Sequence, residues 1–151
     1  MPMMPPADPD CDFCDIVARQ DPDVREIFRT DLVVAFFPLE PATLGHTLLV
    51  PRAHIPDIWG LDAETAAELG RRSVRIAEAV RRAMAPDGLN VIQSNGEAAT
   101  QTIMHLHVHI VPRWHNDSIG QIWPPSSQWT ETQKNQAWEA LKEEFRRPIN
   151  A

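Results

Sequence analysis

The stretch His105-Leu106-His107-Val108-His109 decides the fold and the function of this chain. A β-strand points successive side chains to opposite faces, so a strand here places the three histidines on one face and the apolar residues on the other. We expect Met104, Leu106, Val108 and Ile110 on that apolar face, packed into a core. Imidazole changes its protonation near neutral pH, attacks electrophiles and binds metals. The row therefore predicts a reaction site on a strand.

Bulk composition limits the classes of protein to consider. A chain of 151 residues with 43% hydrophobic content fits one globular domain. The formal charge of −7 argues against non-specific nucleic-acid binding, which needs many Lys and Arg. No apolar run reaches the roughly 18–20 residues that span a bilayer, so we expect no membrane partner. Residues 1–10 are proline-rich and predict a flexible tail, followed by a single domain over 11–151.

Periodicity and turn residues predict an α+β fold. A largely antiparallel sheet of about five strands, one long helix and a C-terminal helix are expected. Asp62 is the expected N-cap of the long helix, and Pro86 and Gly88 follow its end. The predicted helices span 11–19, 62–84 and 131–147, and the predicted strands span 25–30, 32–37, 46–51, 88–94 and 103–113.

Two chemistries fit the histidine row. The imidazoles can chelate zinc from one face of the strand, or one can attack phosphorus while its neighbours stabilise charge. They can also be surface residues without a role. Metallohydrolase patterns add a nearby carboxylate, which residues 98–113 lack. The preceding loop, 95–102, is rich in small and hydrogen-bonding side chains that suit an anion.

Cys11 and Cys14 have the two-residue spacing that lets two thiolates reach one tetrahedral ion. Two cysteines alone do not make a disulfide scaffold, and we expect a cytoplasmic protein. A pair of buried, reduced cysteines is the alternative.

Several segments together resemble the histidine triad (HIT) superfamily, in particular bacterial-type HIT hydrolases similar to diadenosine polyphosphate hydrolases. The defining motif, His-φ-His-φ-His-φ-φ with φ an apolar residue, matches residues 105–111. Residues 45–54 resemble a second family segment, in which a strand leads to Pro, a basic residue and His. Residues 11–16 resemble the family's N-terminal opening, and residues 94–96 and 112–114 match bacterial-type members.

The resemblance implies a HIT-like fold and cleavage at the α-phosphate of a nucleotide without a catalytic metal. His107, the middle histidine, is the implied nucleophile, and His109 and His105 complete the catalytic set. Asn95 and Thr102, with the local backbone, are the implied contacts to the phosphate oxygens, and Arg113 is a candidate contact on a polyphosphate. Gln101 is a further implied substrate-binding residue. The base pocket is expected among apolar residues of the N-terminal helix and first strands, namely Phe13, Ile16, Phe28, Leu32 and Phe36.

In zinc-containing branches of the superfamily, two such cysteines join two histidines around one ion. Mapped onto this sequence, the implied ligands are Cys11, Cys14, His54 and His105. Four protein ligands close the coordination sphere, so this zinc is expected to be structural.

Two residues depart from the family pattern. Thr100 stands where a glycine is usual, and a β-branched residue fits a left-handed backbone poorly. Pro38 stands where many members carry an aspartate that binds the ribose hydroxyls, although Glu40 is near in sequence.

The combined reading is a homodimeric hydrolase, joined through the long helix and an edge strand. The expected substrate is a dinucleoside polyphosphate or a nucleoside phosphoramidate, which is a small-molecule partner. Phosphorolysis, a nucleotide-binding regulatory module with little turnover, and a zinc hydrolase using all three triad histidines are the alternatives. His46 and His115 have no spacing argument, and a structural or surface hydrogen bond is expected for each.

Overall fold

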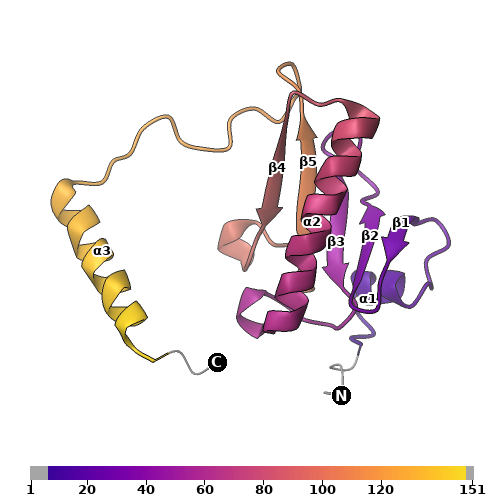
Figure 1. Ribbon diagram of the computed structural model, residues 1–151, viewed down its shortest axis with the longest axis horizontal. Helices are drawn as coiled ribbons and strands as arrows, with labels where there is room; N and C mark the ends of the chain where they lie inside the picture. The colour runs from indigo at the N-terminus through magenta and orange to yellow at the C-terminus, as the bar shows by residue number, and fades with distance from the viewer. Residues whose placement is uncertain (1–6, 149–151) are drawn as a thin grey trace. The chain divides into compact units, whose positions relative to one another are not determined.

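A computed structural model of the chain describes residues 7–148 (Figure 1). The chain divides into two compact units, with the boundary between Ser118 and Ile119. The first unit has the predicted α+β architecture, with a five-stranded sheet and helices. Most of the proposed flexible tail, residues 1–6 of 1–10, lies outside the described residues. The single domain over 11–151 stays a prediction.

The sheet has the predicted antiparallel character. Its strands are β1 (Arg25–Arg29), β2 (Val33–Phe37), β3 (Thr47–Pro51), β4 (Gly88–Gln93) and β5 (Val108–Arg113). Their spatial order is β1-β2-β3-β5-β4, and every neighbouring pair is antiparallel. The strand that contains His109 therefore lies inside the sheet, between β3 and β4.

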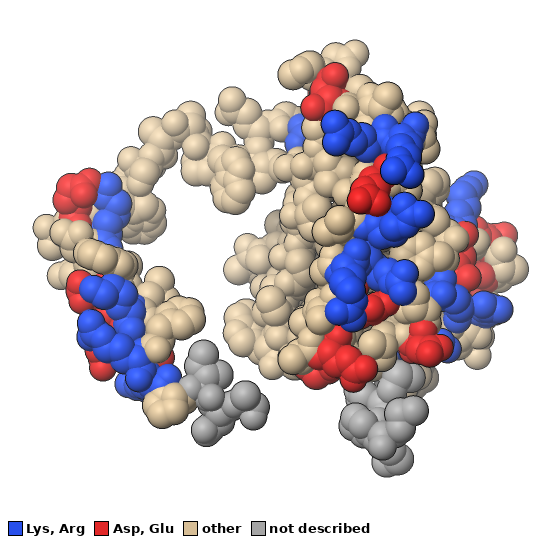
Figure 2. All heavy atoms as spheres, in the orientation of Figure 1, with Lys and Arg blue, Asp and Glu red and all other residues tan. Residues whose placement is uncertain are grey.

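The long helix α2 (Ala63–Met84) covers one face of the sheet (Figure 1). The Asp62 side chain accepts a hydrogen bond from the Thr65 amide at 2.9 Å, which confirms the predicted N-cap. Leu69, Ile76 and Val80 of α2 pack against the sheet residues Val33, Ala35, Leu49, Leu106, Val108 and Ile110. Arginines gather on the solvent side of α2 although the chain is acidic overall (Figure 2).

The short helix α1 (Asp12–Val17) belongs to the second hydrophobic cluster. This cluster joins Cys11, Phe13, Cys14 and Ile16 to Val34, Phe36, Leu48 and Val50. Neighbours along β2 and β3 alternate between the two clusters, as the period of two in a strand requires. The side of the sheet opposite α2 is therefore the one that receives α1.

The strand predicted over residues 103–113 is shorter at its N-terminal end in the structure. It begins at Val108 and not at Ile103, because Pro51 ends the partner strand and has no N–H to donate to a further rung. The predicted faces are correct for Leu106, Val108 and Ile110, which are buried in the α2-facing core, whereas Met104 is 47% exposed.

The second unit contains α3 (Glu131–Arg146), close to the predicted helix 131–147. Thr130 and Gln133 form a capping box at its start. The apolar side chains Trp138, Leu141 and Phe145 are exposed. No helix within residues 7–148 combines the length and apolar character that crossing a membrane requires.

Candidate active site and metal centre

The last two triad histidines lie together on the α1 side of the sheet. The ring centroids of His107 and His109 are 4.9 Å apart. Phe13 of α1 sets the edge of its ring against His107, with centroids 5.1 Å apart, and against Phe36, with centroids 5.4 Å apart. Both His105 and His107 are buried. The sequence prediction of a clustered histidine row is confirmed, although only His109 lies within β5.

The orientation of the His107 ring follows from one hydrogen bond. Its Nδ1 lies 2.8 Å from the main-chain oxygen of His105. A carbonyl oxygen only accepts, so Nδ1 carries the proton and donates it. The other ring nitrogen of neutral His107, Nε2, then keeps its lone pair. This nitrogen is the one that can attack an electrophile.

His46 joins this cluster, which the sequence alone did not predict. The Ala42 amide donates to Nδ1 of His46 at 3.0 Å, and Nε2 of His46 lies 3.0 Å from Nδ1 of His109. Because Nδ1 of His46 accepts, neutral His46 carries its proton on Nε2 and donates it to His109. Nδ1 of His109 therefore accepts, and Nε2 of His109 bears a hydrogen. The only sequence signal was the place of His46 at the start of β3, which pairs with β5.

Burial keeps these imidazoles neutral. Desolvation is the largest cause that lowers the pKa of His46 and of His107 from its usual value. For His109, desolvation and then the neighbouring His107 lower the pKa to about 4. A neutral His107 retains a ring lone pair, which is the form that nucleophilic attack requires.

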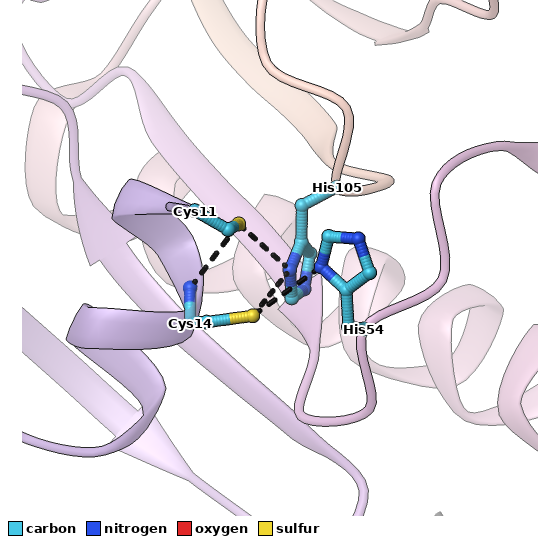
Figure 3. Close-up of side chains that lie close together, drawn as sticks. All are labelled: Cys11, Cys14, His54 and His105. Atoms are coloured by element: carbon cyan, nitrogen blue, oxygen red, sulfur yellow. Dashed lines mark hydrogen bonds between the residues drawn. The ribbon is translucent and has the colours of Figure 1, made fainter. Parts of the chain in front are cut away.

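The four residues named as a zinc set from the sequence come together beside this cluster (Figure 3). Cys11 is the N-cap of α1 and Cys14 lies in its first turn, whereas His54 follows β3 and His105 precedes β5. One ligand atom from each lies within 4.8 Å of all the others. Sγ of Cys11 also accepts a hydrogen bond from the Cys14 amide at 3.4 Å, which suits a metal-bound thiolate.

The distances fit a tetrahedral zinc ion. Zinc–sulfur and zinc–nitrogen bonds of about 2.3 and 2.0 Å at the tetrahedral angle separate S and N by roughly 3.5 Å. Nδ1 of His105 lies 3.5 Å from Sγ of Cys11 and 3.6 Å from Sγ of Cys14, and Nδ1 of His54 lies 3.3 Å from Sγ of Cys14. With four protein ligands, the centre is suited to a structural zinc.

Both histidines of the metal centre have partners for their second nitrogen. Nε2 of His105 lies 2.7 Å from the Pro51 carbonyl oxygen, so it donates its proton there and leaves Nδ1 for the ion. Nε2 of His54 lies 3.9 Å from the Asp8 carboxylate. Asp8 belonged to the expected tail, and the structure places it at the metal centre.

The loop before the triad is held by its own side chains. Gln101 is buried, accepts from the Gly96 amide at 2.8 Å and donates to the carbonyl oxygens of Pro56 and Ile103. The Asn95 side-chain oxygen accepts from the Ile58 amide at 2.7 Å. Gln101 and Asn95 therefore shape the loop, whereas Thr102 is exposed to solvent.

Thr100 adopts a left-handed conformation, the case in which a β-branched residue was expected to fit poorly. Its φ is 70° and its ψ is 21°, at the end of the short 3₁₀ helix η2 (Glu97–Ala99). A β-branched residue in this region is strained.

The structure does not bring Arg113 to the histidines. Arg113 is the last residue of β5, four residues beyond His109, where it donates to the Asp117 carboxylate at 2.7 Å and to the Asn90 side chain at 2.8 Å. Four residues of strand correspond to about 13 Å. Arg113 therefore forms an ion pair with Asp117, and its contact with the distal phosphates of a polyphosphate stays a prediction.

A cavity of about 620 Å³ opens between α1, β2 and the segment after β2. Its wall includes Phe13, Ile16 and Phe36, which were expected in the base pocket, and Pro38. Phe28 and Leu32 were expected there too, but they pack against the α2-facing core instead, because they lie on the other face of the hairpin. Phe13, which lines this cavity, also contacts the His107 ring.

Comparisons with known proteins agree with this site. The HIT domain family matches residues 19–116. Adenosine 5′-monophosphoramidase hnt1 of Schizosaccharomyces pombe is 33% identical over 115 residues, which cover 76% of this chain and 83% of that protein. SMU.412c from Streptococcus mutans UA159 superposes with a TM-score of 0.83 at 36% identity, covering 91% of this chain and 87% of that one. A zinc-bound histidine triad family protein from Mycobacterium smegmatis superposes with a TM-score of 0.69 at 31% identity, covering 89% of this chain and 97% of that one. The matched range contains the whole triad, and this chain belongs to the HIT domain family.

Proposed function

We propose that this protein cleaves a purine nucleotide derivative at its α-phosphate through a covalent nucleotidyl group on His107. The observation that carries the proposal is the 2.8 Å hydrogen bond from Nδ1 of His107 to the His105 carbonyl oxygen, which leaves the Nε2 lone pair free. Phe13, whose ring contacts His107, also lines a cavity of about 620 Å³. The S. pombe relative bears the name of an adenosine 5′-monophosphoramidase, which supports a nucleoside phosphoramidate or a dinucleoside polyphosphate as substrate.

The reaction has two steps. In the first, Nε2 of His107 bonds to the α-phosphorus, and the bond from phosphorus to the leaving nitrogen or oxygen breaks. Nε2–H of His109 donates a hydrogen bond to the leaving atom, which takes its proton from solvent. In the second step, water adds to phosphorus and loses a proton to solvent, and the bond from phosphorus to Nε2 of His107 breaks. A nucleoside monophosphate is released and both histidines return to their starting form.

The protein supplies position and neutral donors in these steps. His46 holds Nδ1 of His109 as an acceptor, so the proton of His109 stays on the nitrogen that faces away from His46. Phe13, Ile16 and Phe36 offer apolar surface to the base, while Thr102 and the loop 95–102 are the proposed phosphate contacts. No metal takes part in the proposed chemistry.

The alternatives differ in what the histidines do. Nδ1 of His105 faces the two cysteine sulfurs, which favours a separate zinc centre over a zinc bound by all three triad histidines. Phosphorolysis uses the same first step, with phosphate replacing water in the second. A third alternative is a nucleotide-binding regulatory module with little turnover. It is supported by the strained backbone of Thr100 in the loop proposed to contact the phosphate.

The test is rapid chemical quench with labelled adenosine 5′-phosphoramidate and a diadenosine polyphosphate, with and without inorganic phosphate. We expect an acid-labile, base-stable adduct on His107 and release of AMP without phosphate. His107→Ala removes both, and the matched control His115→Ala, at an exposed histidine, removes neither. Near-normal turnover in His107→Ala overturns the covalent route. Loss of turnover on chelation with an intact fold favours the zinc hydrolase only if the zinc-loaded protein forms no adduct on His107.

We also propose a cytoplasmic homodimer. Val91 on the edge strand β4 and Val74 on α2 are 54% and 63% exposed, which supports an interface through the long helix and an edge strand. The reduced cysteine pair of a zinc site supports a reducing compartment. Light scattering at micromolar concentration tests the dimer, and a monomeric mass overturns it.

A further inference from the structure

We propose that occupancy of the metal centre sets the orientation of the nucleophile, with His105 as the positioning residue that joins the two. The side chain of His105 belongs to the Cys11–Cys14–His54–His105 cluster, and its main-chain oxygen accepts the hydrogen bond that orients His107. This inference rests on the proposed role of His107. By this inference, bound zinc would orient the His107 ring in addition to stabilising the fold.

The first step of the argument is how His105 is anchored. Its side chain is fully buried, and Nε2 donates to the Pro51 carbonyl oxygen at 2.7 Å. Nδ1 faces Sγ of Cys11 and of Cys14 at 3.5 and 3.6 Å. Thiols are weak hydrogen-bond partners, whereas a zinc ion bonds nitrogen directly at about 2.0 Å. A bound zinc ion therefore holds Nδ1 of His105 more strongly than the two cysteine thiols do without it.

The second step is that the main chain of His105 has no strand to hold it. The ladder of β5 begins at Val108, so residues 103–107 lie outside the sheet. The neighbouring Leu106 amide donates to the Ile55 carbonyl oxygen at 2.7 Å, one residue after the metal ligand His54. The segment that carries the His105 carbonyl is thus held at the imidazole of His105 and by the loop that carries His54.

The third step is what His107 loses when the anchor loosens. Its Nδ1–H is directed by a single acceptor at 2.8 Å, and this bond selects the tautomer with a free Nε2. A shifted carbonyl lets the ring rotate or take the other tautomer, in which Nε2 carries the proton and cannot attack. Metal loss is then expected to lower kcat more than it raises KM.

A second route from the metal centre to the nucleophile runs through α1. Phe13 lies between Cys11 and Cys14 in sequence, and its ring contacts His107 with centroids 5.1 Å apart. Phe13 also lines the proposed base pocket, so loosening of α1 raises KM. The two routes are separable, because only the carbonyl route changes the tautomer of His107.

The experiment uses the full chain labelled with ¹⁵N at histidine, in zinc-loaded and chelator-treated forms. The ring nitrogens of His107 are assigned by their loss in His107→Gln. In the loaded protein we expect the Nδ1–H tautomer alone, and after chelation a mixture. Over the same change kcat falls about tenfold or more, while KM changes by less than about threefold.

Three variants make the test specific. Cys14→Ser reproduces the tautomer mixture and no longer responds to added zinc, whereas Cys14→Asp, which keeps four ligands, retains the loaded pattern at saturating zinc. If Cys14→Ser does not fold, chelated wild type and Cys14→Asp decide the question. Phe13→Leu loosens the α1 contact with all four ligands present, so it raises KM and leaves the tautomer of His107 unchanged.

The outcomes separate this inference from the proposed function. An unchanged His107 tautomer after metal removal overturns the inference, even if the loaded protein forms the covalent adduct. A changed tautomer in a protein that never forms an adduct supports the coupling and contradicts the role of His107 in turnover. A mixture of tautomers in Phe13→Leu with zinc bound overturns the carbonyl route.

Discussion

Nε2 of His46 lies 3.0 Å from Nδ1 of His109, although the two histidines are 63 residues apart in the sequence. The contact forms because β3, which begins one residue after His46, pairs with β5. Nδ1 of His46 in turn accepts from the Ala42 amide, so both tautomers in the pair follow from one main-chain donor. The pair fixes which nitrogen of His109 carries the proton.

His46→Ala tests whether the hydrogen bond from His46 fixes the tautomer of His109. Without the donor, His109 can take the other tautomer, and we expect kcat to fall about tenfold while KM changes little. His46→Gln, whose amide both donates and accepts, should recover part of the loss. Steady-state kinetics at pH 7.5 checks this. Equal kcat values in wild type, His46→Ala and His46→Gln would remove His46 from the mechanism.

Activity and stability should both decline below neutral pH. Burial lowers the pKa of His107, so protonation removes the nucleophile only below its usual value of 6.5, and kcat/KM should be flat above that pH and fall below it. His109 has a folded pKa of about 4. Since the unfolded chain binds its proton first, the stability that neutral His109 provides is present above pH 6.5 and is lost as the pH falls towards 4.

Urea unfolding at pH 7 and pH 5 measures this second effect. His109 alone should lower the free energy of unfolding by roughly 2 kcal/mol between the two pH values. Asparagine does not titrate, so the difference between wild type and His109→Asn gives the contribution of His109. Any destabilisation from metal release at pH 5 occurs in both proteins and cancels in that difference. An identical pH dependence in the two proteins would contradict the buried, neutral state of His109.

Thr100→Gly should stabilise the protein by about 1 kcal/mol, because glycine adopts the left-handed conformation without the strain of a β-branched residue. The neighbouring Ala99→Gly is the matched control. Ala99 lies in η2 and has no positive φ, so glycine there should destabilise by about 0.5–1 kcal/mol. Thermal or urea unfolding of both variants decides the point, and equal effects of the same sign would refute the strain.

Pro38→Asp tests how the sugar is recognised. Pro38 lines the same cavity as Phe13, and its side chain has no group to accept from ribose hydroxyls, so the wild type should discriminate weakly between ribonucleotide and 2′-deoxyribonucleotide substrates. A carboxylate there should improve the preference for ribose about tenfold, the size expected of a hydrogen bond to a charged group. Pro38→Ala removes the proline without adding an acceptor and should leave the ratio of kcat/KM values unchanged. A strong ribose preference in the wild type would contradict this account.

Part of the site was predictable because its residues are close in sequence. Alternation in a strand placed Leu106, Val108 and Ile110 against the core and turned the histidines to the other side. The zinc set was assigned by resemblance, and the structure brings its four residues together. Gln101 and Arg113 were predicted to contact the substrate, and the sequence did not indicate their hydrogen-bond partners within the protein. Gln101 is held by main-chain groups near positions 56, 96 and 103, and Arg113 by Asp117 and Asn90.

The sequence by itself determined the class of fold, the order and type of its elements, and the faces of the triad, because hydrophobic periods of two and of about four residues are local properties. Only the tertiary structure decided that His46 donates to His109, that the ladder of β5 starts at Val108, and that Phe28 lies on the far side of the sheet from the cavity that Phe13 lines. These facts depend on strand order and register. Both are set by packing between segments many residues apart, which no local pattern records.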